Sequence, residues 1–171
     1  MKKILVLGCT GSIGTSTLNI VRSMPEDFSI CGLTAHNNEK SLNFLSNEFS
    51  CDSVLTSKDG IEAIEALIQK TNPDIVVNGI AGAAGLLPSK ITVECGKKLA
   101  LANKETVVMA WPLIKELAFN KDAEIIPVDS EHSAIFSLIN QVGRNNIKNV
   151  IITASGGPFR TLSRDELEKV T

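Results

Sequence analysis

The chain has 171 residues, of which 43% are hydrophobic and 21% are charged, and its net charge is -2 at pH 7. These values are ordinary for a globular protein of one domain, or of one domain and part of a second. A net charge so close to zero gives no support for a surface that binds nucleic acid or an acidic membrane.

The N-terminal segment and the cysteines indicate the compartment. The apolar run Ile4–Leu7 ends at Gly8 and is too short for the apolar core of a signal peptide. No window of the sequence reaches the length of a membrane span. The four cysteines (Cys9, Cys31, Cys51 and Cys95) form no C-x-x-C pair, so we interpret them as buried small hydrophobic residues. We therefore expect a soluble protein of the reducing cytoplasm.

Apolar runs typical of strands alternate with helical patterns along most of the chain. The predicted strands are Lys3–Leu7, Phe28–Leu33, Ser53–Leu55, Ile75–Val77, Lys98–Leu101, Glu124–Val128 and Val150–Thr153. The predicted helices are Ile13–Ser23, Glu39–Glu48, Gly60–Lys70, Pro88–Gly96, Trp111–Asn120 and Ser133–Val142. Near-continuous apolar strands separated by helices indicate a mostly parallel sheet covered on both faces, which is a doubly wound, Rossmann-like α/β fold.

A glycine-rich loop, Gly8-Cys9-Thr10-Gly11-Ser12-Ile13-Gly14, follows the first predicted strand and opens the first predicted helix. Glycines let the main chain turn tightly and approach a pyrophosphate, and the free N–H groups of a helix N-terminus favour its negative charge. Thr10 and Ser12 add hydroxyl donors. The alternative is a glycine turn with an ordinary serine cap. The position of the loop on the first strand of a βαβ chain favours nucleotide binding.

The end of the second predicted strand bears on the choice between NAD and NADP. An NAD site usually has an acidic residue there, which binds the ribose 2′-hydroxyl. Here His36, Asn37 and Asn38 follow the strand, and the first acid is Glu39. Because an acid would repel a 2′-phosphate, its absence favours NADP, and Lys40 is nearby. The alternative is that these polar residues only cap the next helix.

Two later segments also follow predicted strands, so they belong at the carboxyl edge of the sheet, where doubly wound folds bind ligands. In Asn103-Lys104-Glu105, the lysine is a cation directed at the same edge as the glycine loop. The alternative is a surface lysine beside an acid. In Ser155-Gly156-Gly157, two glycines after a serine can form a nest of N–H donors for an anion, and the alternative is a plain turn.

The segment Asp129-Ser130-Glu131 follows the predicted strand Glu124–Val128. In an extended or turning segment, residues i and i+2 point the same way, so the two carboxylates can converge on one point. Carboxylates that close repel each other unless a cation or a proton lies between them, and Mg²⁺ or Mn²⁺ prefers such oxygen ligands. The alternative is a solvated acidic loop leading into a helix with Glu131 in its first turn.

Together and in this order, these motifs resemble the 1-deoxy-D-xylulose 5-phosphate reductoisomerase family. The resemblance covers the whole chain, from Gly8–Gly14 through Ala81–Leu86 to Ser155–Arg160, and Leu101–Glu105 and Pro127–Phe136 are highly specific to the family. It implies a dimeric enzyme of non-mevalonate isoprenoid biosynthesis, which converts 1-deoxy-D-xylulose 5-phosphate to 2-C-methyl-D-erythritol 4-phosphate with NADPH and Mg²⁺ or Mn²⁺.

The resemblance further implies an NADPH-binding Rossmann-like domain over residues 1–126 and the beginning of an α+β catalytic domain over residues 127–171. The implied NADPH contacts are Thr10, Gly11, Ser12 and Ile13 at the pyrophosphate, His36, Asn37 and Asn38 at the adenosine phosphate, and Asn103 and Glu105 at the nicotinamide half. The implied metal ligands are Asp129 and Glu131. The implied substrate contacts are Lys104, Ser130, Glu131 and Ser155, of which Lys104 and Glu131 are catalytic. For His132 the interpretation is a cap of the following helix.

Two features depart from the family. It often has glycine and then a cation where this chain has His36-Asn37, which should weaken the selectivity for NADP over NAD. The family also continues beyond Thr171, with the third metal carboxylate in that region. We therefore expect a truncated chain that binds NADPH weakly and does not turn over substrate. The alternatives are a stand-alone NADPH-binding module and another reductase, such as a semialdehyde dehydrogenase, whose cysteine nucleophile none of the four cysteines resembles.

Overall fold

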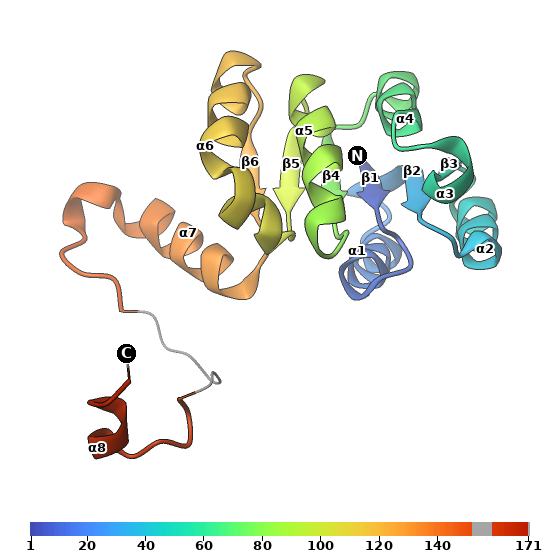
Figure 1. Cartoon of the computed structure of the whole chain (residues 1–171). Coiled ribbons are helices and arrows are strands. Elements are labelled where there is room, and N and C mark those ends of the chain that lie inside the picture. The colour runs from blue at the N-terminus through green and yellow to red at the C-terminus, as the bar shows by residue number, and fades with distance from the viewer. Residues whose placement is uncertain (152–158, 171) are drawn as a thin grey trace. The chain divides into compact units, whose positions relative to one another are not determined.

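The computed structural model describes residues 1–151 and 159–170, and a parallel sheet forms its centre (Figure 1). The strands are β1 (Lys2–Leu7), β2 (Phe28–Ala35), β3 (Asp52–Leu55), β4 (Ile75–Asn78), β5 (Lys98–Leu101) and β6 (Ile125–Pro127). All neighbouring pairs are parallel, in the order β3-β2-β1-β4-β5-β6. The order reverses between β1 and β4, and such a reversal opens a crevice at the carboxyl ends of the strands.

Helices connect the strands and cover both faces of the sheet (Figure 1). They are α1 (Ser12–Ser23), α2 (Glu39–Phe49), α3 (Thr56–Asp59), α4 (Ala63–Thr71), α5 (Leu86–Glu94) and α6 (Lys104–Asn120), with the 3-10 turn η1 (Ala83–Gly85). After the last strand come α7 (Ser130–Val142), the 3-10 turn η2 (Arg144–Asn146) and α8 (Arg164–Leu167). The predicted doubly wound α/β fold is confirmed.

The core lies on both sides of β1. On one face, Leu18 of α1 and Leu42 of α2 pack together with Val6 of that strand. On the other face, Ile64 of α4 packs with Leu5, and both side chains are fully buried. Burial of each such side chain contributes roughly 1.5–3 kcal/mol to folding. This core fixes the carboxyl ends of the central strands, and the loops at those ends form the candidate site.

The chain divides into two compact units, Met1–Ser133 and Ala134–Thr171. The first contains the whole sheet and α1 to α6. The division falls inside α7, close to the domain boundary expected between residues 126 and 127, and that boundary stays a prediction. In the second unit, α8 begins at a capping box, in which the N–H and the hydroxyl of Ser163 both donate to the Glu166 carboxylate at 2.7 Å.

Some predicted boundaries were wrong. Helix α6 begins at Lys104 rather than at Trp111, and its main chain leaves helical geometry at Ala110 (φ -147°), two residues before Pro112. The predicted helix corresponds to the part after this kink, because proline interrupts the helical hydrogen bonds. Helix α7 begins three residues before Ser133. In the predicted strand at residues 150–153, the first two residues are not in a strand, and the last two lie outside the described residues.

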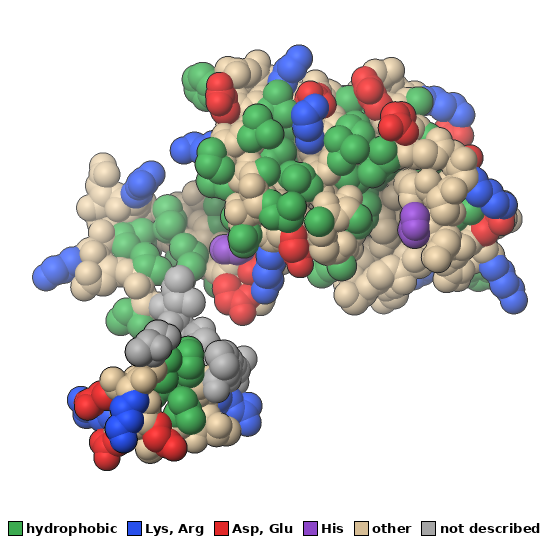
Figure 2. Space-filling view, in the orientation of Figure 1, with side chains coloured by type: hydrophobic (Ala, Val, Ile, Leu, Met, Phe, Trp, Pro, Cys, Tyr) green, Lys and Arg blue, Asp and Glu red, His purple; other side chains and the backbone are tan. Residues whose placement is uncertain are grey.

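Hydrophobic side chains gather on the surface over α5 and α6 (Figure 2). On α6, Val108 and Phe119 are 84% and 87% exposed, and Met109 and Leu113 are also exposed. Apolar surface of this kind often marks a contact with another part of a protein or with a partner. Among the described helices, none combines the length and the apolar character that crossing a bilayer requires.

Candidate functional site

A cleft of about 440 Å³ opens at the carboxyl edge of the sheet, beside the reversal in strand order. The loops after β1, β2 and β4 and the segment after β3 form its walls. The lining residues include Gly8, Thr10, Gly11, His36, Thr56 and Gly79. Three of the nine predicted cofactor contacts (Thr10, Gly11 and His36) therefore line one cavity, at the position where doubly wound folds bind dinucleotides.

The glycine loop brings main chain, rather than side chains, to this cleft. Gly8 has a φ of +77°, a left-handed conformation that favours glycine, and a Cβ atom on Gly14 would lie only 2.4 Å from the Gly8 carbonyl oxygen. Gly11 precedes α1 and has no side chain with which to cap it. The first amide N–H groups of α1, at Ser12 and Ile13, therefore have no helical partner, and this arrangement suits a phosphate group.

The end of β2 supports the glycine loop and contains no acid. The Thr34 carbonyl accepts hydrogen bonds from the Gly8 and Cys9 N–H groups at 3.1 and 2.8 Å. Beyond the strand, His36 lines the cleft, and its Nδ1 lies 3.1 Å from the Thr56 hydroxyl. Asn38 caps α2, since its Oδ1 accepts from the Ser41 N–H at 3.2 Å. The capping alternative therefore describes Asn38, whereas His36 remains available to a ligand.

Next to the end of β2, the acidic residue is paired with a lysine, and a further lysine is nearby. Glu39, the first acid after β2, forms an ion pair with Lys58 at 2.7 Å. Lys40 and Asn38 line a second hollow of about 520 Å³ on the other side of Thr10. A 2′-phosphate in this region would meet a neutralised carboxylate and a nearby ammonium, which is electrostatically favourable.

The side-chain amide of Asn103 forms its hydrogen bonds within the protein. Asn103 caps α6 and is only 3% exposed. Its Oδ1 accepts from the N–H of Thr106 at 2.7 Å, and its Nδ2 donates to the carbonyl oxygens of Ile80 and Gly82 at 2.7 and 2.8 Å. Its amide also lies 3.2 Å from the exposed carboxylate of Glu105. The predicted nicotinamide contact of Asn103 stays a prediction, and its side chain has no donor to spare for one.

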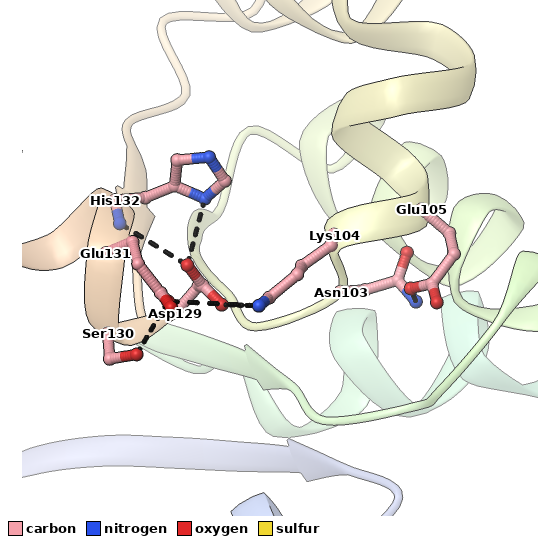
Figure 3. A network of polar contacts seen from close by, with 7 residues as sticks. All are labelled: Asn103, Lys104, Glu105, Asp129, Ser130, Glu131 and His132. Carbon is pink, nitrogen blue, oxygen red and sulfur yellow. Dashed lines mark hydrogen bonds and ion pairs between the residues drawn. The ribbon is translucent and has the colours of Figure 1, made fainter. Parts of the chain in front are cut away.

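Lys104, Asp129 and Glu131 form a charged cluster at the same edge of the sheet (Figure 3). Lys104 follows β5 and Asp129 follows β6, and these strands are neighbours. The Lys104 Nζ lies 2.7 Å from Asp129 Oδ2 and 3.8 Å from Glu131 Oε2. The two carboxylates thus converge on one cation. The spacing of i and i+2 suggested an extended or turning segment, and the structure shows a helix start, because Ser130 already begins α7.

The ion pair shifts the pKa of both partners. The hydrogen bond to Asp129, and then its negative charge, raise the pKa of the Lys104 ammonium. The bond from Lys104 lowers the pKa of the Asp129 carboxyl; desolvation opposes this shift, and the N–H of His132 adds to it. Both groups are therefore charged at neutral pH, and the Asp129 side chain, which is 9% exposed, holds a negative charge that needs a cation.

The residues fit a divalent ion in charge and in ligand type, since carboxylate oxygens suit Mg²⁺ and Mn²⁺. Within residues 1–151 and 159–170, however, no group of three or more His, Cys, Asp or Glu side chains could enclose a metal. The charged cluster therefore supplies two carboxylates, and an ion bound there competes with the Lys104 ammonium for them.

The remaining predicted residues lie around the charged cluster or outside the described chain. The Ser130 hydroxyl donates to Glu131 Oε2 at 2.7 Å. The interpretation of His132 as a cap was wrong, because Asp129 Oδ1 accepts from the His132 N–H at 3.3 Å, so Asp129 caps α7. Glu131 is 56% exposed in the first turn of α7, as the alternative interpretation of this segment expected. Ser155 lies outside the described residues.

Comparison with models of protein families identifies the family of this chain. The family model described as 1-deoxy-D-xylulose 5-phosphate reductoisomerase matches residues 4–60 and 55–111, and the model of its C-terminal domain matches residues 125–171. The chain belongs to the 1-deoxy-D-xylulose 5-phosphate reductoisomerase family. The resemblance stated from the motifs is confirmed.

Individual reductoisomerases match almost the entire chain. The protein named so from Treponema denticola is 44% identical over 99% of this chain and 47% of its own length, and that from Thermoanaerobacter sp. (strain X514) is 40% identical over 100% and 49%. The solved reductoisomerase from Zymomonas mobilis in complex with NADPH is 32% identical, with a TM-score of 0.83, over 99% of this chain and 50% of that one. The chain spans about half the length of the curated relatives it matches.

A second solved reductoisomerase, in complex with magnesium, is 31% identical with a TM-score of 0.80 and covers 100% of this chain and 50% of that one. A homoserine dehydrogenase from Thiobacillus denitrificans, 18% identical with a TM-score of 0.59 over 77% of this chain and 30% of its own, shares the fold alone.

In this member of the reductoisomerase family, sequence reasoning missed Thr56, which lines the cleft, and Thr106, which is fully buried and does not line it. Thr56 contacts His36, and the buried hydroxyl of Thr106 contacts Asn103. Neither has a motif of its own. The one available signal for Thr106 is its position three residues after an asparagine that follows a strand, a spacing typical of a helix cap.

Proposed function

We propose that this chain is the cofactor-binding part, and the first piece of the metal- and substrate-binding part, of a 1-deoxy-D-xylulose 5-phosphate reductoisomerase. The proposed reaction rearranges that substrate and reduces it with NADPH to 2-C-methyl-D-erythritol 4-phosphate. One observation carries the proposal: the glycine-loop cleft and the charged cluster of Lys104, Asp129 and Glu131 lie at one edge of one sheet.

The cofactor would bind in the cleft beside the glycine loop. The main-chain N–H groups of Ser12 and Ile13 would hold the pyrophosphate, with Thr10 beside it. His36 lines the cleft and would lie next to the adenosine half, and Lys40, in the second hollow, would supply positive charge nearby. The related reductoisomerase from Zymomonas mobilis was solved in complex with NADPH, which supports the choice of this cofactor.

Asp129 and Glu131 would hold a divalent ion, and Lys104 and Ser130 would contact the sugar phosphate. When bound, the ion supplies Lewis-acid chemistry and NADPH supplies the hydride. The residues of this chain would contribute charged groups and would position the substrate and the cofactor. The Lys104 ammonium, fully charged beside Asp129, can stabilise negative charge that develops on a substrate oxygen. The related reductoisomerase solved in complex with magnesium supports the choice of a divalent ion.

We expect the 171-residue chain by itself to bind NADPH weakly and not to turn over substrate, because two carboxylates and no third ligand surround the cation position in the described residues. The same observation favours the alternative function, a stand-alone NADPH-binding module without catalysis. A homodimer and a cytoplasmic location remain predictions from the family.

The first test is titration of the purified chain with NADPH and, separately, with NADH, followed by nicotinamide fluorescence. We expect tighter binding of NADPH. Equal binding of both would contradict the NADP preference, and binding of neither would contradict the cofactor site. Addition of Mn²⁺ and 1-deoxy-D-xylulose 5-phosphate then separates the two functions. Substrate-dependent oxidation of NADPH would show a catalytic chain and would refute the stand-alone module.

A further inference from the structure

A chain of buried polar side chains connects the end of β4 to the beginning of α6. Its members, Asn78, Ser89, Thr106 and Asn103, are 0%, 0%, 0% and 3% exposed. Asn78 Nδ2 donates to the Ser89 hydroxyl at 2.8 Å, and that hydroxyl lies 3.3 Å from the Thr106 hydroxyl. The Thr106 hydroxyl donates to Asn103 Oδ1 at 2.5 Å. Buried networks in which every group is satisfied make local structure rigid.

Both ends of this network hold the same peptide segment. The Ile80 N–H donates to Asn78 Oδ1 at 3.1 Å, and Asn103 Nδ2 donates to the carbonyl oxygens of Ile80 and Gly82. The N–H group of Ile80 is therefore bound by a side chain of β4, and its carbonyl oxygen is bound by the N-cap residue of α6. Because Gly79, Ile80 and Ala81 line the cleft, the network determines the shape of the cleft wall beside β4.

Thr106 sets the orientation of the Asn103 amide. The N–H and the hydroxyl of Thr106 both donate to Oδ1, which leaves Nδ2 facing the two carbonyl oxygens of the loop. A flipped amide would place donor against donor at Thr106 and acceptor against acceptor at Ile80. The packing leaves little room for other arrangements, since a Cβ atom on Gly85 would lie 2.6 Å from Asn103 Nδ2.

We propose that Thr106 is a positioning residue for the nicotinamide half of NADPH, acting through Asn103 on the loop at residues 79–82. This inference rests on the proposed function. In a doubly wound sheet the dinucleotide crosses the strand reversal, so its adenosine half lies towards β2 and its nicotinamide half towards β4 and β5. The hydrogen bonds printed for the network side chains join β4, α5, the start of α6 and the loop at residues 80–85, and none of them reaches β2. Its loss therefore weakens binding of the nicotinamide half and leaves the adenosine half unchanged.

The test compares two ligands on variants of the complete 171-residue chain. One ligand is NADPH, and the other is 2′-phospho-ADP-ribose, which lacks the nicotinamide group. For Thr106→Val, which removes the hydroxyl and keeps the shape, Asn103 Oδ1 retains only the bond from the main-chain N–H of residue 106. We expect NADPH to bind about tenfold more weakly, because the loop at residues 79–82 is then less ordered before the cofactor binds. We expect 2′-phospho-ADP-ribose to bind within about twofold of the wild type. Thr106→Ser, which restores the hydroxyl, should bind both ligands like the wild type.

Thr92→Val is the matched control, because Thr92 is also fully buried and its hydroxyl donates to the Pro88 carbonyl at 2.8 Å, outside the network. It should leave the ratio of the two affinities unchanged. Equal weakening of both ligands by Thr106→Val, no weakening of either, or the same NADPH-selective loss in Thr92→Val would overturn the inference. A wild-type chain that binds neither ligand would instead refute the cofactor site itself, and with it the role of Thr106.

Discussion

The cofactor cleft and the charged cluster lie at the same edge of the sheet but are built differently. The cleft is lined by glycine-rich main chain, by small residues and by apolar side chains such as those of Ile61, Ile64 and Ile80, next to the buried core around β1. The charged cluster is formed by side chains, and those of Lys104 and Glu131 are 57% and 56% exposed. The packing of the core therefore determines the shape of the cleft. The arrangement of the charged cluster depends instead on an ion pair, in which we expect that another cation can replace the Lys104 ammonium.

This difference predicts that the two regions can be disabled separately. Changes to the backbone of the glycine loop should alter stability and cofactor binding together. Changes to the charged cluster should alter cation binding and leave the fold intact, because exposed charges contribute little to stability.

Gly14→Ala is expected to have the largest effect. Its Cβ atom would lie 2.4 Å from the Gly8 carbonyl oxygen and 2.6 Å from the Cys9 Cα, so the loop must move away from α1. We expect the free energy of unfolding to fall by about 3 kcal/mol and NADPH binding to be lost. Denaturant unfolding and cofactor titration measure the two effects.

Gly11→Ala is the matched control for this prediction. Its Cβ atom would lie 3.4 Å from the Gly8 carbonyl oxygen, an ordinary contact, and its φ of -82° suits alanine. It should keep the stability of the wild type and still weaken NADPH binding, because the methyl group would lie where we propose that the pyrophosphate binds. If Gly14→Ala proved more stable than the wild type, as alanine in an open helix should be, the close approach in the loop would be refuted.

Asp129→Asn should weaken Mn²⁺ binding at least tenfold, since a partly buried carboxylate loses its charge while the shape is kept. Asparagine can still accept from the His132 N–H, so the start of α7 and the stability of the chain should persist. Electron paramagnetic resonance of free Mn²⁺ measures the affinity. Asp52→Asn is the control, because Asp52 forms a comparable ion pair with Lys70 at 2.6 Å. A parallel loss of NADPH binding in Asp129→Asn would contradict the independence of the two regions.

Lys104→Met should strengthen Mn²⁺ binding a few-fold, because it removes the ammonium that competes for the two carboxylates. The sign of this change is the informative result, since removal of a supporting residue would weaken binding instead. Lys58→Met, which breaks the ion pair with Glu39 at 2.7 Å, should leave the affinity unchanged. An unchanged or weaker affinity in Lys104→Met would show that Lys104 does not occupy the cation position.

The sequence motifs named all three residues of the charged cluster, but they predicted the local structure of the glycine loop better than the contacts within the cluster, for a physical reason. The glycine loop, β1 and the start of α1 depend on neighbours within a few residues, so their pattern is visible along the chain. The ion pair of Lys104 and Asp129 joins residues from two different strand ends, and only the strand order brings them together. The network through Thr106 depends on packing alone, and no local pattern predicts it.

The smallest expected effect concerns Cys9, which lies inside the glycine loop and is fully buried. Burial raises the pKa of its thiol to about 11, so at pH 8 only about one molecule in a thousand carries the reactive thiolate. Alkylation of Cys9 by iodoacetamide should therefore be slow and should accelerate as the pH rises towards 11.

The effect of NADPH and of Mn²⁺ on the alkylation rate of Cys9 tests whether either ligand reduces the opening of the glycine loop. NADPH should slow the alkylation of Cys9 two- to threefold, because a ligand bound to the folded loop reduces its opening. Mn²⁺ should leave the rate unchanged, because the charged cluster shares no described hydrogen bond with the loop. Mass spectrometry of the peptide that contains Cys9 distinguishes it from the other three cysteines. Protection by Mn²⁺ alone would show that the two regions open together, and the cleft would then depend on the cation as well as on the core.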